Sequence, residues 1–433
     1  MYHPSISDLY NIYIKHPVIC TDTRMLSKGC LFFALKGDNF NGNKFAEKAL
    51  NDGAAYVIID EKEFAVNEKC ILVDDVLNEL QQLATHHRRL LKIPVIAITG
   101  SNGKTTTKEL TAAVLSKKYN TLYTKGNLNN HIGVPLTLLS ITSQHELAVV
   151  EMGANHQKEI EALCNIAEPN FGLITNIGKA HLEGFGGIEG VKKGKGELYQ
   201  FIKSTNGLIL LNGDNPVLIE LIAGYDKVIS YGSEEELNVI GKMIVNDSFL
   251  SVICRKPFSL EINTHLTGDY NFENVMSAVA MGHHFKVAPE KIKEAIENYY
   301  PSNQRSQVIS KPNNVTLVLD AYNANPSSVH AALENFSKSF SGNKIVALGD
   351  MLELGNESEA EHKEVVNQLQ KQNFTKVILV GQQFKLFENL PGLLHFNTSA
   401  EAADWFRTNH FYDCTILIKG SRGIKMEVIA DVF

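Results

Sequence analysis

The stretch Ile96-Ala97-Ile98-Thr99-Gly100-Ser101-Asn102-Gly103-Lys104-Thr105-Thr106-Thr107 carries the strongest local signal in the chain. The apolar run over residues 94–98 predicts a buried strand, and residues 104–117 predict a helix after a glycine-rich turn. This order is the context of a phosphate-binding loop, because glycines let backbone N–H groups surround phosphate oxygens at a helix N-terminus. Ile98 stands where the G-x-x-x-x-G-K-[ST] pattern has its first glycine, so an ordinary strand-to-helix turn is the alternative.

The loop predicts where a nucleoside triphosphate would lie. Lys104 would reach the β- and γ-phosphates, and the Thr105 hydroxyl would contact Mg²⁺. The residues expected to surround the phosphates of ATP are Gly100, Ser101, Asn102, Gly103, Lys104, Thr105 and Thr106.

The composition is that of an ordinary globular protein. The chain has 433 residues, of which 44% are hydrophobic and 21% charged, and this length predicts two to four domains. Its formal net charge of −7 argues against a general nucleic-acid-binding role. We expect no signal peptide in residues 1–18 and no membrane span, since no apolar run approaches about 20 residues. Six scattered cysteines without metal-ligand spacing predict reduced thiols in a cytoplasmic protein.

The pattern of apolar runs predicts an α/β fold in three domains, with limits at residues 1–92, 93–308 and 309–433. The first, small α/β domain has expected strands at 31–35 and 55–59 and expected helices at 45–50 and 75–91. The last of these helices ends in the basic cluster His86–Arg89, which we expect to be a solvated helix end.

The central domain predicts a mostly parallel sheet with covered faces, then an antiparallel edge over residues 238–266. A hinge is predicted at Pro301-Ser302-Asn303. The last domain repeats the alternation in a Rossmann-like arrangement, but no G-x-G-x-x-G follows its first strand, so we predict no dinucleotide site there. The expected strands are 148–152, 171–177, 207–212, 227–231, 315–319, 344–348, 376–380 and 415–418, and the expected helices include 271–284 and 289–299.

Polar residues follow several of these strands, at the edge where ligands bind in open α/β sheets. Glu151 could be a metal ligand there, and His181 could contact Mg²⁺ or substrate, although a lone histidine is often structural. Lys192–Glu197 could be only a charged helix face. Asn127–Pro135 offers three amides for a polar ligand, with a decorated loop as the alternative. In the first domain, Thr21–Arg24 could hold a ligand or form a plain turn.

These residues together resemble the Mur ligases, the ATP-dependent ligases of peptidoglycan synthesis. The glycine loop is shared with folylpolyglutamate synthetases, so it does not choose among members. The choice rests on Asn127–Pro135, Asp320–Ser327, Leu348–Gly355 and Lys419–Arg422, which resemble the member that joins D-alanyl-D-alanine to UDP-N-acetylmuramoyl-tripeptide. Asp22-Thr23-Arg24 with Leu31–Gly37 resembles a uridine-nucleotide-binding domain.

One signature of a sister enzyme is missing. The relative that forms the tripeptide carries Asp-Asn-Pro-Arg for a diamino acid, whereas Gly213-Asp214-Asn215-Pro216-Val217 lacks the arginine and lies in the wrong domain. The sequence does not say whether the tripeptide would end in meso-diaminopimelate or lysine.

The resemblance implies roles for named residues. Thr105 and Glu151 would hold one Mg²⁺, and His181 with Lys195 a second, Lys195 being the lysine that CO₂ converts to a metal-binding carbamate. Lys104, Lys195 and His181 would serve catalysis. Asn271 and Asn274 would contact adenine, and Arg305 and Asp320 would grip ATP once the last domain closes. The expected substrate contacts are Thr23, Arg24, Asn129, Asn130, Asn323, Asn325, Ser327, Lys419 and Arg422.

The implied chemistry is acyl activation, in which a carboxylate attacks the γ-phosphate and an amine then displaces phosphate from the acyl phosphate. We expect a monomer. The rivals are a sister ligase, a nucleotide-switched protein that makes no bond, and a catalytically dead homologue. The presence of Lys104, Glu151, His181 and Lys195 argues against the last of these.

Overall fold

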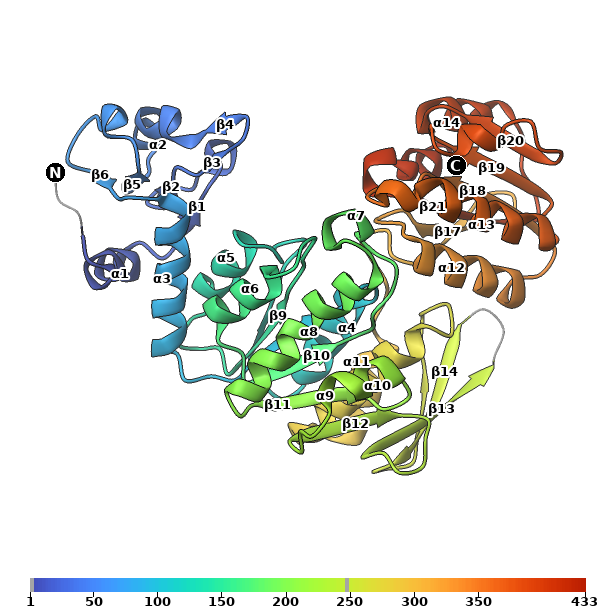
Figure 1. Cartoon of the computed structure of the whole chain (residues 1–433), viewed down its shortest axis with the longest axis horizontal. Helices are drawn as coiled ribbons and strands as arrows, with labels where there is room; N and C mark the ends of the chain where they lie inside the picture. Colours follow the sequence, from blue (N-terminus) through green and yellow to red (C-terminus); the bar gives the residue numbers. More distant parts are fainter. Residues whose placement is uncertain (1–3, 246–248) are drawn as a thin grey trace.

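The computed structural model describes residues 4–245 and 249–433. In this part of the chain, three α/β domains follow one another, each built on its own main sheet (Figure 1). The predicted fold class is confirmed. The N-terminal and C-terminal domains lie on opposite sides of the central domain in the view of Figure 1.

The N-terminal domain is a parallel sheet of order β1-β2-β5-β6 with short helices around it. Its strands are β1 (Ile19–Cys20), β2 (Leu31–Phe33), β5 (Tyr56–Ile59) and β6 (Cys70–Leu72), with a small hairpin of β3 (Lys36–Gly37) and β4 (Phe40–Asn41). Its helices are α1 (Ile6–Lys15), α2 (Ala46–Asn51) and the 3₁₀ turns η1 (Thr23–Met25), η2 (Gly42–Phe45) and η3 (Lys62–Phe64). Helix α1, which Ser5 caps at its N-terminus, was not predicted from the sequence.

Helix α3 (Val76–Leu90) joins this domain to the central one and packs against α1, α5 and α6 (Figure 1). Its basic end is not the solvated cluster that we expected. His87 and Arg88 are buried, and the Arg88 guanidinium donates to the carbonyls of Ala167, Leu91 and Glu168 and to Asn170 Oδ1 at 2.8–3.0 Å. The expectation was wrong for these two residues because most of their hydrogen-bond partners, such as Ile141 for His87 and Ala167 for Arg88, lie far away in the sequence.

The central domain is a twisted sheet of order β15-β14-β13-β12-β11-β10-β7-β9-β8. Pairing is parallel from β8 to β13 and antiparallel among β13, β14 and β15, which confirms the predicted antiparallel edge. The strands are β7 (Val95–Thr99), β8 (Thr121–Tyr123), β9 (Leu147–Glu151), β10 (Phe171–Ile174), β11 (Leu208–Asn212), β12 (Val228–Gly232), β13 (Val239–Val245), β14 (Leu250–Lys256) and β15 (Leu260–Asn263).

Helices cover both faces of this sheet. The apolar faces of α4 and α10 bury Leu110, Val114 and Val275 against one side, while α3, α5, α6 and α8 pack on the other. The helices are α4 (Lys104–Leu115), α5 (Gly133–Leu139), α6 (Glu159–Ala167), α7 (Leu182–Phe185), α8 (Ile188–Ser204), α9 (Pro216–Ile222), α10 (Asn271–His284) and α11 (Pro289–Glu297).

The C-terminal domain has a sheet of order β16-β17-β21-β18-β19-β20, parallel except for the edge strand β16. Its strands are β16 (Gln307–Lys311), β17 (Val315–Asp320), β18 (Asn343–Gly349), β19 (Lys376–Val380), β20 (Leu393–Phe396) and β21 (Cys414–Lys419). Its helices are α12 (Pro326–Ser339), α13 (Ser358–Lys371), α14 (Ser399–Thr408) and the 3₁₀ turns η4 (Gly355–Glu357), η5 (Phe384–Phe387), η6 (Arg422–Ile424) and η7 (Met426–Val432).

The link between the last two domains is residues 298–306, which form neither helix nor strand, and the predicted hinge at 301–303 lies within it. The domain limits themselves stay a prediction. All six cysteines fall in the described residues and are free and buried. Over residues 4–245 and 249–433, no helix is both apolar and long enough to cross a membrane.

Candidate active site

A cavity of about 690 Å³ lies between the central and C-terminal domains. Its central-domain wall is formed by the loop between β7 and α4, by the ends of β9 and β10 and by the start of α10. Its opposite wall comes from the end of β17, the start of α12 and Lys419. Most of the predicted site residues line it, whereas Gly100, Lys195, Arg422, Thr23 and Arg24 are not part of the lining.

The glycines of the loop are required by its conformation. Gly100 has φ +140°, and a Cβ there would lie 2.0 Å from Thr175 Oγ1. Gly103 has φ +80°, and a Cβ there would lie 2.6 Å from Asn274 Oδ1. A side chain at either position would combine backbone strain with a clash. The loop can therefore approach its neighbours closely, and the first residues of α4 that follow it line the cavity.

Lys104 begins α4 and folds back over the loop. Its Nζ donates to the carbonyls of Gly100 (2.7 Å) and Ser101 (3.1 Å). Burial lowers the pKa of Lys104 to about 8, and Arg305 adds to this effect while Glu151 opposes it. The cavity therefore holds a cation that gains from an anionic ligand such as phosphate.

Glu151, at the end of β9, presents a carboxylate oxygen that is only partly neutralised. Asn129 Nδ2 donates to its Oε1 at 2.7 Å, while Lys108 Nζ lies 3.6 Å from its Oε2. Among the described residues, Oε2 has no hydrogen-bond partner although the side chain is buried. The buried Thr105 also lines the cavity. This pair of oxygen donors suits Mg²⁺, which prefers hard oxygen ligands and keeps water in its shell.

His181 and Lys195 are the two residues that the resemblance implied for a second Mg²⁺. His181 lines the cavity, and its Nδ1 pairs with the Glu353 carboxylate of the C-terminal domain. Lys195 is 1% exposed, and its Nζ donates to the carbonyl of Ala154, a cavity residue, at 2.9 Å. Burial lowers the pKa of Lys195 well below its usual range, with a further contribution from Lys104. Lys193, by contrast, is exposed.

The two asparagines predicted to contact adenine form part of a buried amide chain. Thr107 Oγ1 donates to Asn274 Oδ1 (2.8 Å), Asn274 Nδ2 to Asn271 Oδ1 (2.7 Å), and Asn271 Nδ2 to the Thr267 carbonyl (2.7 Å). Each amide nitrogen carries two hydrogens, so one on each remains for a ligand. Helix α10 is thereby fixed to α4 beside the cavity.

The C-terminal domain contributes cations and one carboxylate. Lys419 Nζ, 2% exposed, donates to Asp320 Oδ2 at 2.6 Å and to the Asn323 carbonyl at 3.2 Å. The guanidinium of Arg305 lies 3.8 Å from the ring centroid of Tyr322, and that of Arg422 lies 5.0 Å from it. Tyr322 lines the cavity, and its ring attracts both guanidinium groups. Its function was not predicted, although an aromatic residue in a polar string after a strand is a usable signal.

Helix α12 begins directly against the phosphate-binding loop. Asn325 caps α12, and its Nδ2 donates to Asn102 Oδ1 at 2.8 Å. The backbone N–H of Lys179 donates to Ser327 Oγ at 3.0 Å. Asn176, which also escaped prediction, accepts from Asn102 N at 3.0 Å and holds the loop on its other side.

Some predicted substrate contacts have local roles. Asn130 lines the cavity, but its Oδ1 accepts from Ile132 N and Gly133 N at the start of α5. Arg24 pairs with Asp22 on the surface of the N-terminal domain, next to Thr23 in η1. The functions of the predicted site residues, these included, stay predictions.

The fold and the cavity define a class of enzyme, with three α/β domains and a phosphate-binding loop facing the third domain. Matches to family descriptions give the class its name: "Mur ligase family, catalytic domain" over residues 17–88, "Mur ligase middle domain" over 98–282, and "Mur ligase, glutamate ligase domain" over 304–422. The chain belongs to the Mur ligase family, as the resemblance implied.

Particular relatives are similar over nearly their whole length. UDP-N-acetylmuramoyl-tripeptide–D-alanyl-D-alanine ligase of Bacillus subtilis (strain 168) is 35% identical over 434 residues, covering 95% of this chain and 92% of the relative. A crystal structure of MurF from Acinetobacter baumannii has a TM-score of 0.86 at 32% identity and covers 96% of this chain and 92% of that one. The MurF ligase of Thermotoga maritima in complex with ADP has a TM-score of 0.86 at 25% identity and covers 97% of both chains.

Proposed function

We propose that this chain is the ATP-dependent ligase that joins D-alanyl-D-alanine to UDP-N-acetylmuramoyl-tripeptide, giving UDP-N-acetylmuramoyl-pentapeptide, ADP and phosphate. The observation that carries the proposal is the cavity, whose lining combines Lys104 of the central domain, Lys419 of the C-terminal domain and Arg305 of the link between them. The relatives of matching length that bear this activity in their names support it.

The first step joins two anions. The terminal carboxylate of the tripeptide attacks the γ-phosphorus of ATP, the bond to the β-phosphate oxygen breaks, and an acyl phosphate and ADP result. Lys104 and the N-terminus of α4 stabilise charge on the phosphates, and Arg305 and Lys419 add positive charge from the opposite wall. Thr105 with Glu151, and His181 with carbamylated Lys195, would hold two Mg²⁺ ions that supply further charge neutralisation.

The environment of Lys195 favours its carbamylation. An amine must be neutral to add to CO₂, and burial lowers the pKa of Lys195. The addition forms an N–C bond, releases one proton and leaves a carboxylate-like anion in place of an ammonium. That anion can bind a cation which the ammonium would repel.

The second step forms the peptide bond. The free amine of D-alanyl-D-alanine attacks the acyl carbon, and phosphate leaves. Asn323, Asn325 and Ser327 stand at the C-terminal wall where the dipeptide would lie. Closure of that wall would exclude water, which would otherwise hydrolyse the acyl phosphate. Thr23 and Arg24 would hold the uridine end of the other substrate on the N-terminal domain.

The same chemistry supports the remaining proposals. Because the reaction uses ATP and a nucleotide-linked substrate, we infer that it takes place in the cytoplasm. We also propose that the chain acts as a monomer, since residues of its own central and C-terminal domains line both walls of the cavity.

The experiment is phosphate release from Mg²⁺–ATP with the nucleotide tripeptide and D-alanyl-D-alanine, each omitted in turn. We expect release only with both, and a product whose mass equals the pentapeptide nucleotide. Use of a different amine would move the chain to a sister ligase. Release that needs neither acceptor would favour a nucleotide switch, and no release under any combination would favour a dead homologue.

A further inference from the structure

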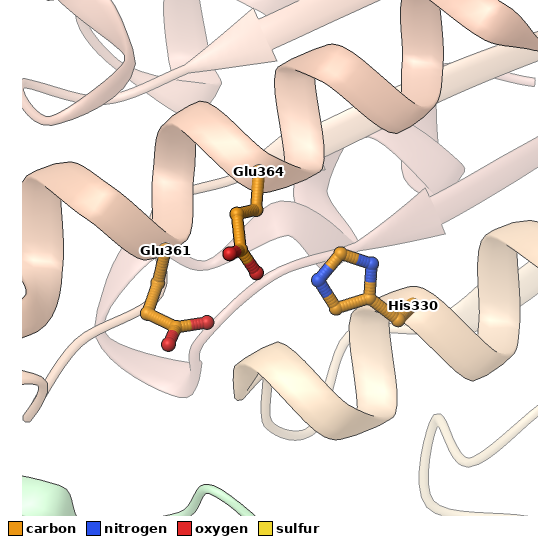
Figure 2. A group of neighbouring side chains, drawn as sticks. All are labelled: His330, Glu361 and Glu364. Atoms are coloured by element: carbon orange, nitrogen blue, oxygen red, sulfur yellow. The ribbon is translucent and has the colours of Figure 1, made fainter.

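Three side chains with metal-binding atoms gather in the C-terminal domain (Figure 2), and none of them belongs to the lining of the cavity. Glu361 and Glu364 are three residues apart on α13 and so share one face of that helix. His330 comes from α12, which packs beside it. One potential ligand atom from each residue lies within 4.8 Å of the other two.

The hydrogen bonds of His330 leave one ring nitrogen available. Its Nδ1 pairs with Gln368 Oε1, and Gln368 Nε2 donates to the His330 carbonyl at 3.2 Å. Because an amide oxygen only accepts, Nδ1 carries the proton and Nε2 keeps its lone pair. In Figure 2 one ring nitrogen points toward the two glutamates. A partner that fixes the protonated nitrogen is the usual support of a metal-binding histidine.

Glu361 adds a second, independent observation. It is 4% exposed, and its Oε1 accepts from Lys179 Nζ at 2.5 Å. Among the described residues its other oxygen, Oε2, is buried without a hydrogen-bond partner. Figure 2 shows one carboxylate oxygen of Glu361 directed toward His330. A buried carboxylate oxygen without a donor is costly unless a cation satisfies it.

We propose that His330, Glu361 and Glu364 form a binding site for a dication of the Zn²⁺ class. One imidazole and two carboxylates are ligands that Zn²⁺ accepts, with water completing its shell. The imidazole nitrogen disfavours Mg²⁺ and Ca²⁺, which select oxygen ligands. Glu364 is exposed, so its flexible side chain can close the remaining distance to the ion.

The site is coupled to the contact between domains through Lys179. This lysine belongs to the central domain, and its ammonium occupies one oxygen of Glu361. A dication bound to the same carboxylate repels that ammonium. Zn²⁺ binding therefore weakens the Lys179–Glu361 ion pair, and removal of the Lys179 charge strengthens Zn²⁺ binding. The inference does not depend on the substrate proposed above.

The test titrates the full chain with ZnCl₂ by calorimetry in excess Mg²⁺, and records the visible absorption of the Co²⁺-loaded protein. We expect one Zn²⁺ equivalent whose affinity falls at least tenfold in His330→Ala and Glu364→Gln and rises in Lys179→Met. Gln368→Ala weakens binding about 10–100-fold by freeing the ring. Glu359→Gln, an exposed charge-matched change on the same helix, leaves it unaltered.

The Co²⁺ spectrum separates this site from others. Its bands should be lost in His330→Ala and retained in Glu359→Gln, with both variants showing the thermal midpoint of the parent. Equal Zn²⁺ affinity and an unchanged Co²⁺ spectrum in the His330→Ala protein would overturn the proposal, as would the absence of any Zn²⁺ equivalent in the parent. Neither result would change the outcome expected in the ligase assay, so the two proposals can fail separately.

Discussion

At the scale of single residues, the cavity is organised by charges that lack complete partners. Within residues 4–245 and 249–433, Glu151 has one hydrogen-bonded oxygen and one without a donor, and Lys104 donates only to carbonyls of its own loop. Both arrangements are unfavourable in isolation and favourable once a cation and a phosphate are present. The sequence identified both residues, but it did not indicate that Asn129 bonds to Glu151, because the two are 22 positions apart.

Replacement of Lys104 tests the phosphate-binding loop. We expect Lys104→Ala to reduce ligation by at least about 10²-fold while the protein stays folded, because the transition-state charge loses its nearest cation. The matched control is Lys117→Ala, just beyond the other end of α4, where the ammonium pairs with Glu294 on the surface. Near-normal turnover in folded Lys104→Ala would refute the assignment.

The lowered pKa of Lys104 predicts that nucleotide affinity falls as the pH rises. The ammonium that attracts phosphate is present below about pH 8 and is lost as the pH rises through the lowered pKa. ADP affinity, measured by calorimetry on the free enzyme, should therefore be level below that pH and decline above it. The decline should vanish in Lys104→Ala, and its persistence there would point to another titrating group.

Lys195 and Lys193 lie on the same helix, and comparing them separates a function of the buried lysine from an effect of surface charge. Lys195→Ala should be severely impaired in ligation yet still bind ADP, while Lys193→Ala should resemble the parent, since only Lys195 is buried beside the cavity. With ¹³C-bicarbonate, a carbamate signal should appear in the Lys193 variant and be missing in the Lys195 variant. Impairment of Lys193→Ala instead would mean that the carbamylation site is wrong.

At the scale of elements, the sequence pattern correctly predicted helices and strands that depend on interactions between residues close in sequence. The β7–loop–α4 unit follows from an apolar run, two glycines and a helix-forming segment, and it formed within two residues of the expected limits. The prediction for the end of α3 failed because a basic cluster on a helix is usually solvated. Burial of Arg88 is favourable here because three of its acceptors lie in residues 167–170, about 80 positions away in the sequence. The interdomain pair of His181 and Glu353 could not be predicted for the same reason, since the two residues are far apart in the sequence.

Arg88 and its neighbour give a matched test of this element. Arg88→Met should lower the free energy of unfolding by more than about 2 kcal/mol, since several buried acceptors lose a charged donor. Arg89→Met, which loses one exposed ion pair with Glu168, should cost less than about 1 kcal/mol. Thermal unfolding of both proteins decides it, and equal midpoints would mean that Arg88 contributes little.

At the scale of the whole molecule, the cavity exists only because two domains meet. The sequence predicted the two groups of polar residues and the hinge, but not their contacts, such as Asn325 with Asn102, because no local pattern encodes an approach between domains. The proposed reaction needs this wall to open for substrates and close for chemistry.

A reversible cross-link tests that motion. A Cβ on Gly178 would lie 3.3 Å from Ser327 Cβ, close to the separation that a disulfide spans. In a Gly178→Cys/Ser327→Cys protein, oxidation should stop turnover because substrate cannot enter, and a reductant should restore the activity of the reduced double variant. Each single variant should be insensitive to oxidation. Full turnover in the cross-linked protein would show that the two domains need not separate.

The anchoring of α3 has a consequence for the choice of substrate. Its buried end ties the N-terminal domain to the central sheet, and Tyr13 of α1 adds a hydrogen bond to the Leu139 carbonyl. The C-terminal domain, by contrast, is joined through the irregular segment 298–306. A nucleotide substrate held on the N-terminal domain would therefore have to bridge a fixed distance for its reactive end to reach Lys104. The length of the substrate's peptide, and not only the chemistry of its side chains, would then decide which nucleotide substrates can react.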